Sequence, residues 1–250
     1  MQFLRLFVNY PLHCLRKQIS SLKNLEMELT KQYDSVIKDF ITLNKKMNEI
    51  SDKAFWKSLM PFLKEGGRAI DFGCGPGDLI TDISKYMECA GVDTSFEMVS
   101  FAKNKTNADV RLEDFANTSF ENASFDLVVS KWAMQTSKEI EPIYKEAGRL
   151  LKSGGYFVFL VVHPFRQFLE KKKVGKNYFK QEIVISTIFA GTITVEEPSH
   201  TLSEYLSNAF LNEFTIVASE EGKEGVEFPA AEQIGGDIYP TYLIITAQKK

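Results

Sequence analysis

The chain has 250 residues, 44% hydrophobic and 25% charged, an ordinary composition for a globular protein that can bury a large core. A formal net charge of −3 and a pI near 5.8 exclude a general attraction to nucleic acid or anionic membranes. No apolar stretch approaches the roughly 20 residues of a membrane span, so we expect no stable membrane insertion.

Cysteine and histidine usage narrows the site chemistry. The three cysteines and three histidines show no paired spacing, so we expect neither a disulfide framework nor a metal held by the protein. Unpaired cysteines are typical of a reducing compartment, and we expect a cytoplasmic location.

The first 26 residues differ from the rest, because basic residues accompany an apolar run and the first acid is Glu26. Arg5 interrupts that run and no small-residue cleavage site follows, so a secretory signal is not indicated. Three interpretations remain: an inert extension, disordered or helical, which we favour; a membrane-surface anchor; or residues upstream of a natural start at Met27. We therefore predict an extension over 1–26 and a single domain over 27–250.

Two amphipathic helices are predicted over 31–47 and 52–64, ahead of a glycine-rich turn. Residues 68–78 give a short strand carrying Asp71, three glycines at alternate positions and the start of a helix. Glycines let the backbone adopt positive φ and let a ligand approach the main chain closely. A second strand, 89–92, ends in Asp93, an acid placed to accept hydrogen bonds from ribose hydroxyls. This order predicts a nucleoside-cofactor site.

The spacing of the glycines argues against a dinucleotide. Dinucleotide-binding turns read G-x-G-x-x-G/A, whereas here Asp78 takes the third glycine's place. An acid at a helix N-terminus disfavours a pyrophosphate, which prefers bare N–H groups and the positive end of the helix dipole. A nicotinamide-dependent oxidoreductase is therefore a distant alternative.

The later segments alternate between strands and helices. A short run over 110–114 ends in Asp114, and 125–130 is nearly continuous in apolar residues, as expected of a buried parallel strand. Apolar positions at helical spacing predict a helix over 140–151, ended by Lys152 and the glycines after it. A further strand follows over 156–162. The alternation predicts a parallel sheet with right-handed crossovers and helices on both faces.

With its Asp-x-Gly-x-Gly-x-Gly turn, its later acids and the phrase Arg149-Leu-Leu-Lys-Ser-Gly-Gly155, the chain resembles the class I S-adenosylmethionine (SAM)-dependent methyltransferases. Within them it resembles the small-molecule, ubiquinone-biosynthesis-like "type 11" branch, strongly over 50–162 and more weakly over 163–250. The resemblance implies a Rossmann-like α/β fold with seven strands in the order 3-2-1-4-5-7-6, the last antiparallel, from segments 214–217 and 242–246.

The resemblance also implies a substrate lid over 163–212. The sequence there predicts a short helix, two strands over 183–188 and 192–195 joined at Ala190-Gly191, and a helix from a capping box at Thr201 through Leu211.

The resemblance assigns most cofactor contacts to the strand ends. Asp71 would fix the glycine turn or reach the cofactor amine through water, Asp93 would bind the ribose, and Ser130 would face the methionine moiety. Met98 is equally expected as a core residue, and Tyr33 as a packing tyrosine. The implied cofactor-binding residues are Tyr33, Asp71, Gly73, Cys74, Gly75, Gly77, Asp93, Thr94, Met98, Asp114, Phe115 and Ser130, with Asp114 and Phe115 on the adenine.

The implied function is methyl transfer from SAM to a small-molecule acceptor, leaving S-adenosyl-L-homocysteine (SAH). His163 and His200 are the candidate general bases, although either is as readily a structural histidine. Ser130-Lys-Trp-Ala133 replaces the Asp/Asn-Pro-Pro-Tyr/Phe motif, which argues against DNA or glutamine methylation. The alternatives are an RNA methyltransferase, which the acidic pI disfavours, and a non-catalytic SAM-binding regulatory protein. We expect a monomer or homodimer with no nucleic-acid partner and no metal.

Overall fold

The computed structural model describes residues 48–171, 174–188, 193–224 and 239–250. The predicted extension over 1–26, the predicted helix over 31–47, Tyr33 and the predicted turn at Ala190-Gly191 lie outside these residues.

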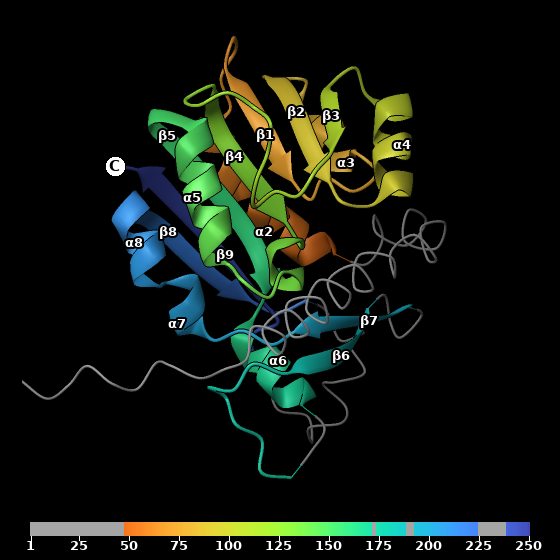
Figure 1. Ribbon diagram of the computed structural model, residues 1–250, viewed down its shortest axis with the longest axis vertical. Coiled ribbons are helices and arrows are strands. Elements are labelled where there is room, and N and C mark those ends of the chain that lie inside the picture. The colour runs from red at the N-terminus through yellow and green to blue at the C-terminus, as the bar shows by residue number, and fades with distance from the viewer. Residues whose placement is uncertain (1–47, 172–173, 189–192, 225–238) are drawn as a thin grey trace, which may run out of the picture.

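A seven-stranded sheet forms the centre of the molecule, in the order β3-β2-β1-β4-β5-β9-β8 (Figure 1). Strands β1 to β5 run parallel, whereas β9 is antiparallel to β5 and β8 is antiparallel to β9. Once the separate β6–β7 hairpin is set aside, this is the predicted order with its antiparallel strand. The strands of the sheet are β1 (Arg68–Phe72), β2 (Glu88–Asp93), β3 (Asp109–Leu112), β4 (Phe125–Lys131), β5 (Leu151–Val162), β8 (Phe214–Gly222) and β9 (Tyr242–Lys249).

Helices cover both faces because the sheet's apolar residues point alternately to opposite sides. Phe157 and Phe159 of β5 pack with helices α5 (Glu141–Leu150) and α8 (Asn208–Glu213). Val158 and Leu160 join the core on the opposite face, with the helices α2 (Glu49–Leu59), α3 (Asp78–Ile83) and α4 (Phe96–Lys105). The short 3₁₀ helices are η1 (Met60–Phe62) and η2 (Met134–Thr136).

The insertion between β5 and β8 builds a separate layer beyond the carboxyl end of β5. It contains α6 (Pro164–Glu170) and the antiparallel pair β6 (Ile183–Ile188) and β7 (Ile193–Pro198), which lie together in Figure 1. The predicted strands are confirmed, although β7 extends to Pro198. The short helix α7 (Leu202–Tyr205) then leads the chain back to the main sheet.

Two predicted boundaries were wrong. Residues 152–155 were expected after a helix end, but β5 begins at Leu151 and its pairing with β4 shifts register between Phe125 and Leu127. The helix predicted from Thr201 through Leu211 is two helices, α7 and α8, because Ser207 takes extended backbone and caps α8 through the backbone N–H of Phe210.

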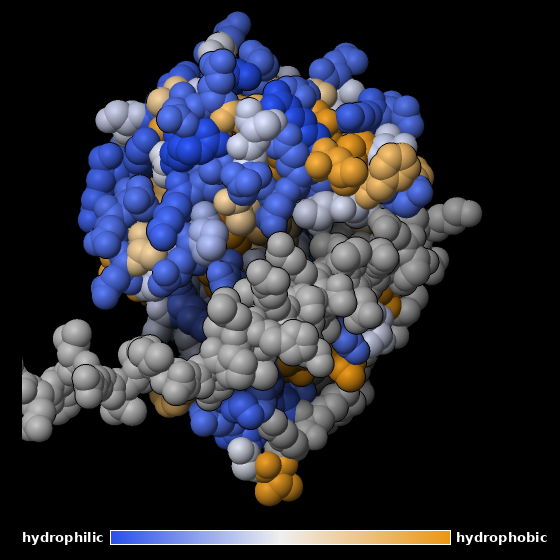
Figure 2. Space-filling view, in the orientation of Figure 1, coloured by the Kyte–Doolittle hydropathy of each residue, from blue (hydrophilic) through white to orange (hydrophobic). Residues whose placement is uncertain are grey.

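The surface in Figure 2 is mainly hydrophilic over α5, whereas apolar side chains gather at the end of the sheet near α4. The large apolar residues exposed in that region include Phe96 and Phe101 on α4 and Leu112 at the end of β3. This end of the molecule also carries the glycine turn between β1 and α3.

Candidate functional site

The predicted glycine turn joins the end of β1 to the first turn of α3. Gly73, Gly75 and Gly77 all have positive φ, at 72°, 51° and 81°. A Cβ at Gly73 would lie 2.3 Å from that of Ala133, so no side chain fits there. The backbone N–H groups of Gly73 and Cys74 donate to the carbonyl of Val92, both at 2.9 Å. The turn is therefore a fixed backbone cradle at the carboxyl edge of the sheet.

Asp93, at the end of β2, is bonded to this cradle. Its two carboxylate oxygens accept hydrogen bonds from the backbone N–H of Gly75, at 2.8 Å, and of Ser95, at 2.9 Å. The residue is half-buried, and the adjacent Thr94 is exposed. Met98 is buried on α4, with its Sδ about 4 Å from where a Cβ of Gly75 would lie. The sheet edge thus brings the predicted acid and the predicted loop together.

Asp71 is buried next to the cradle, and one of its carboxylate oxygens accepts no hydrogen bond from a described residue. It is 3% exposed, and its Oδ1 has no partner among the described residues. Burial raises the pKa of Asp71 to about 7; the nearby Lys131 acts to lower it, and Asp93 acts to raise it. A buried acid beside a backbone cradle fits a ligand with a positively charged group, as a sulfonium cofactor with an amine has.

The two cysteines of the described chain, Cys74 and Cys89, are buried packing residues. Cys74 lies inside the cradle and Cys89 on β2, both buried and unbridged. Burial raises the pKa of the Cys74 thiol well above its usual value, which keeps it protonated and unreactive.

Asp114 and Phe115 occupy the loop after β3. The exposed Asp114 carboxylate accepts a hydrogen bond from the backbone N–H of Ala116, at 2.8 Å. Phe115 is buried and stacks on Phe72, with ring centroids 6.1 Å apart. Because its ring lies 3.6 Å from where a Cβ of Gly73 would be, the loop borders the cradle.

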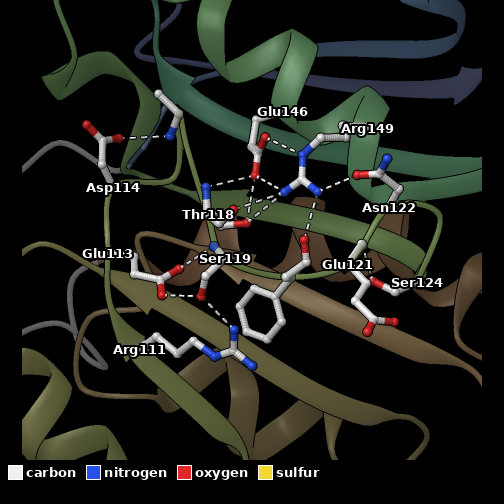
Figure 3. Close-up of polar contacts among 12 residues, drawn as sticks. Arg111, Glu113, Asp114, Thr118, Ser119, Glu121, Asn122, Ser124, Glu146 and Arg149 are labelled. Atoms are coloured by element: carbon white, nitrogen blue, oxygen red, sulfur yellow. Dashed lines mark hydrogen bonds and ion pairs between the residues drawn. The ribbon is translucent and has the colours of Figure 1, made fainter.

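A polar network, which we call the loop clamp, fixes this loop to helix α5 (Figure 3). Glu146 of α5 accepts hydrogen bonds from the backbone N–H of Thr118, at 2.8 Å, and from its hydroxyl, at 2.6 Å. Arg149 donates to the carbonyl of Phe120, at 2.7 Å, and is paired with Glu146. Glu113 accepts from the backbone N–H of Ser119, at 2.8 Å, closing the loop at its base. The sequence had suggested Arg149 only as part of a family phrase.

The end of β4 holds the predicted Ser130, followed by two residues to which the sequence assigned no cofactor contact, Lys131 and Trp132. Ser130 is buried and donates to the carbonyl of Phe72, at 3.0 Å. Lys131 pairs with Asp52 of α2, at 2.9 Å. Trp132 has a φ of 57°, which is strained for a bulky residue and is found mainly at functional positions. No glycine or asparagine marked that turn in the sequence.

The two candidate bases lie in different surroundings. His163 caps α6: its Nδ1 accepts from the backbone N–H of Phe165, at 3.0 Å, and its Nε2 lies 2.7 Å from a carboxylate oxygen of Glu221. His200 is buried, with its Nε2 3.2 Å from the carbonyl of Gln135. Its Nδ1 has no hydrogen-bond partner among the described residues, and Glu204 Oε2 lies 3.6 Å away.

The described part of the chain contains neither a cluster of metal-ligating side chains nor a membrane-spanning helix. No group of three or more histidine, cysteine, aspartate or glutamate residues in those ranges is arranged to hold a metal ion. Within the same ranges no helix is long and apolar enough to cross a membrane.

Comparisons with known proteins match this geometry. The family model described as "Methyltransferase domain" matches residues 70–159, from β1 to β5. An uncharacterized protein of Methanocaldococcus jannaschii is 29% identical over 185 residues, covering 74% of this chain and 69% of that protein. A demethylmenaquinone methyltransferase of Staphylococcus saprophyticus is 33% identical over 106 residues, covering 39% of this chain and 46% of the enzyme.

Solved structures show the same fold. The crystal structure of a SAM-dependent methyltransferase, described as putative, from Listeria monocytogenes aligns with a TM-score of 0.62 at 22% identity. The alignment covers 80% of this chain and 99% of that one. The chain thus spans nearly all of this structure but about half the length of the demethylmenaquinone enzyme.

Proposed function

Because the chain is a class I SAM-dependent methyltransferase, we propose that it methylates a small-molecule acceptor held beneath residues 163–212. The observation that carries this proposal is the placement of α6 and the β6–β7 hairpin beyond the carboxyl end of β5, the edge that also holds the glycine cradle. Open α/β sheets bind their ligands at this edge. The name of the demethylmenaquinone relative supports an acceptor of small-molecule size.

We propose that the cofactor lies along the cradle in the order of the strands. The backbone of Gly73, Gly75 and Gly77 would line the methionine side, together with Ser130. Asp93 would accept from the ribose hydroxyls, while Asp114 and Phe115 would hold the adenine. Asp71 would face the positive groups of the cofactor. SAM, when bound, supplies an activated methyl group on a sulfonium.

The chain's own part in the reaction is alignment and proton removal. We propose His200 as the base in preference to His163, because only His200 has a ring nitrogen without a hydrogen bond to a described residue. With Nε2–H donating to the Gln135 carbonyl, Nδ1 carries a lone pair. It would take the acceptor's proton as the acceptor's lone pair forms the new bond to carbon. The C–S electron pair stays on sulfur, and Glu204 would stabilise the imidazolium.

The rival nucleic-acid function is disfavoured by how the cations at this edge are used. Phosphate binding requires Lys and Arg that are free to meet phosphates. Instead Lys131, at the end of β4, pairs with Asp52. Lys105 likewise pairs with Asp78.

Calorimetry with SAH tests the cofactor assignment. Asp93→Ala should weaken SAH binding by about 1–3 kcal/mol, because acceptors for the ribose are lost. Asp82→Ala, which removes a half-exposed acid on α3, is the matched control and should bind SAH normally. Unchanged binding by Asp93→Ala would overturn the ribose assignment, and binding of NADH without SAM would overturn the proposed function.

A further inference from the structure

Among the buried polar atoms outside the cofactor cradle that have no hydrogen-bond partner in the described residues, three belong to neighbouring residues. They are Oε1 of Gln135, Nδ1 of His200 and the hydroxyl of Tyr205. The residues are 4%, 2% and 0% exposed. Burying a polar atom without a partner is unfavourable, and native proteins do so rarely. Three such atoms in one region therefore indicate a missing partner.

The three residues are neighbours although they come from distant parts of the sequence. His200 Nε2 lies 3.2 Å from the Gln135 carbonyl, and the rings of His200 and Tyr205 are 5.5 Å apart. Gln135 belongs to η2, which follows β4, whereas His200 and Tyr205 follow β7. Because Ala133 abuts the glycine cradle, this group, which we call the polar triad, lies on the cofactor's edge of the sheet.

Each member of the triad is fixed by bonds made through its other atoms. The amide nitrogen of Gln135 donates to the Trp132 carbonyl, at 2.8 Å, which sets the direction of Oε1. The backbone N–H of His200 donates to Gln167, at 2.9 Å. The Tyr205 carbonyl accepts the hydroxyl of Tyr144, also at 2.9 Å. Atoms held in place before binding are the mark of a pre-organised site.

The chemistry of the three atoms defines what they can bind. Gln135 Oε1 is an acceptor, and His200 Nδ1 is an acceptor when Nε2 carries the proton. Burial raises the pKa of Tyr205 well above its usual value, so its hydroxyl stays protonated and can donate. A ligand that completes the triad must both donate and accept hydrogen bonds, as a hydroxyl group does.

Charge around the triad disfavours an anionic ligand. Two cations close to its members are already paired: Lys131, at the end of the strand before Gln135, with Asp52, and Arg166, next to the Gln167 that binds His200, with Glu170 at 3.0 Å. Glu204 adds a carboxylate 3.6 Å from His200. The rings of Tyr205 and Phe159, 6.3 Å apart, provide an apolar wall beside the polar atoms.

We infer that Gln135, His200 and Tyr205 bind the methyl acceptor and that this acceptor is a neutral molecule with a hydroxyl group on an apolar body. The inference rests on the proposed function and makes it more specific, because it excludes carboxylates and phosphates as the group recognised at this site.

Unfolding measurements without any acceptor test whether the Tyr205 hydroxyl lacks a hydrogen bond in the unliganded protein. Tyr205→Phe should leave the Tm unchanged or raise it, because no bond is lost. The matched control is Tyr144→Phe, another fully buried tyrosine in the same core, whose hydroxyl is bonded to the protein. Its loss should lower the Tm by about 2–4 °C. A similar fall in Tyr205→Phe would show that water or protein already satisfies the hydroxyl and would overturn the inference.

Binding of defined probes to the SAH-loaded protein tests the ligand chemistry. We choose 1-naphthol and 1-naphthoate, which share an apolar body and differ in the polar group, and measure binding by ligand-observed NMR. Naphthol should bind, and about tenfold more weakly to Tyr205→Phe. Preference for naphthoate, absence of naphthol binding, or equal naphthol binding by both proteins would overturn the inference. SAH titration of the same samples separates this outcome from failure of the proposed function, in which SAH itself does not bind.

Discussion

Asp71 is a carboxyl group whose environment differs sharply between the folded and unfolded chain. Its folded pKa is raised to about 7 by burial, against roughly 3.9 when unfolded. Between these values the folded protein binds more protons than the unfolded chain, so the free energy of unfolding falls as pH rises from about 4 to 7. Above pH 7 the buried, ionised Asp71 carboxylate therefore lowers the free energy of unfolding of the cofactor-free protein.

We expect Asp71→Asn to remove this pH dependence. At pH 8 the variant should be more stable than the original chain by about 1–3 kcal/mol, because no buried charge remains. At pH 4 the difference should shrink, since Asp71 is then protonated. Denaturant unfolding at the two pH values measures both effects, and an equal difference at both would contradict the assigned pKa.

The same residue should make cofactor binding release a proton. A positive group beside Asp71 favours the ionised carboxylate and lowers its pKa. Near pH 6.5, SAM binding should then release up to about one proton. Calorimetry in two buffers of different ionisation enthalpy measures this number. Asp71→Asn should release none, and equal release by both proteins would place Asp71 away from the charged groups.

Among single residues, the sequence predicted the glycines that turn the backbone and the acids that end the strands. The positive φ of Gly73, Gly75 and Gly77 was expected because glycine alone adopts it without strain. The positive φ of Trp132 was not predictable, since the cost for a bulky residue is met by tertiary packing. The hydrogen bond between His200 and the Gln135 carbonyl could not be predicted either, because the two residues lie far apart in the sequence.

The loop clamp, which joins the loop after β3 to helix α5, should determine how well the protein recognises adenine. If the loop 113–119 presents Asp114 and Phe115 to the base, Glu146→Ala should weaken SAH binding by about 1–3 kcal/mol, as its bonds to Thr118 are lost. Glu146→Gln keeps an acceptor oxygen and should lose less. The exposed neighbour Lys145, changed to Ala, is the control.

A measurement of base selectivity separates this positioning role from general destabilisation. S-inosyl-homocysteine replaces the adenine amino group with an oxygen, so the original chain should prefer SAH. Glu146→Ala should reduce that preference, whereas a variant that is only less stable should bind both ligands more weakly in the same proportion. An unchanged preference would leave the clamp with a purely structural role.

Element boundaries were predictable where hydrophobic periodicity was long and failed where local capping decided them. The spacing over 140–151 matched α5, which runs from Glu141 to Leu150. The split between α7 and α8 depends on the single hydroxyl of Ser207. That bond competes with a continuous helix, and periodicity cannot detect it.

In the molecule as a whole, Glu224, which follows β8, is bonded to helix α2 near the start of the described chain. It is 2% exposed, and its carboxylate accepts hydrogen bonds from the backbone N–H of Ser51, at 2.6 Å, and of Ile50, at 3.3 Å. These are two of the first N–H groups of α2, whose own N-cap, Asn48, makes no side-chain capping bond. A carboxylate there also interacts favourably with the helix dipole. An acid beyond β8 thus caps the helix that precedes β1.

Removal of this cap should weaken the whole domain and not only α2. Glu224→Ala should lower the free energy of unfolding by about 1–3 kcal/mol, because buried N–H groups lose their acceptor. Glu224→Gln keeps one oxygen and should cost less, whereas Glu220→Ala, which removes a half-buried acid of β8 that makes no bond to α2, serves as a control. Denaturant unfolding gives the three values.

Hydrogen exchange extends the same prediction to the site. Because α2 carries Asp52, which pairs with Lys131 at the end of β4, loosening its first turn should reach the edge where Asp71 lies. Glu224→Ala should speed exchange at the amides of Ile50 and Ser51 and also weaken SAH binding. Faster exchange with unchanged SAH affinity would show that the cap stabilises α2 without ordering the cofactor edge. Unchanged exchange would contradict the cap itself.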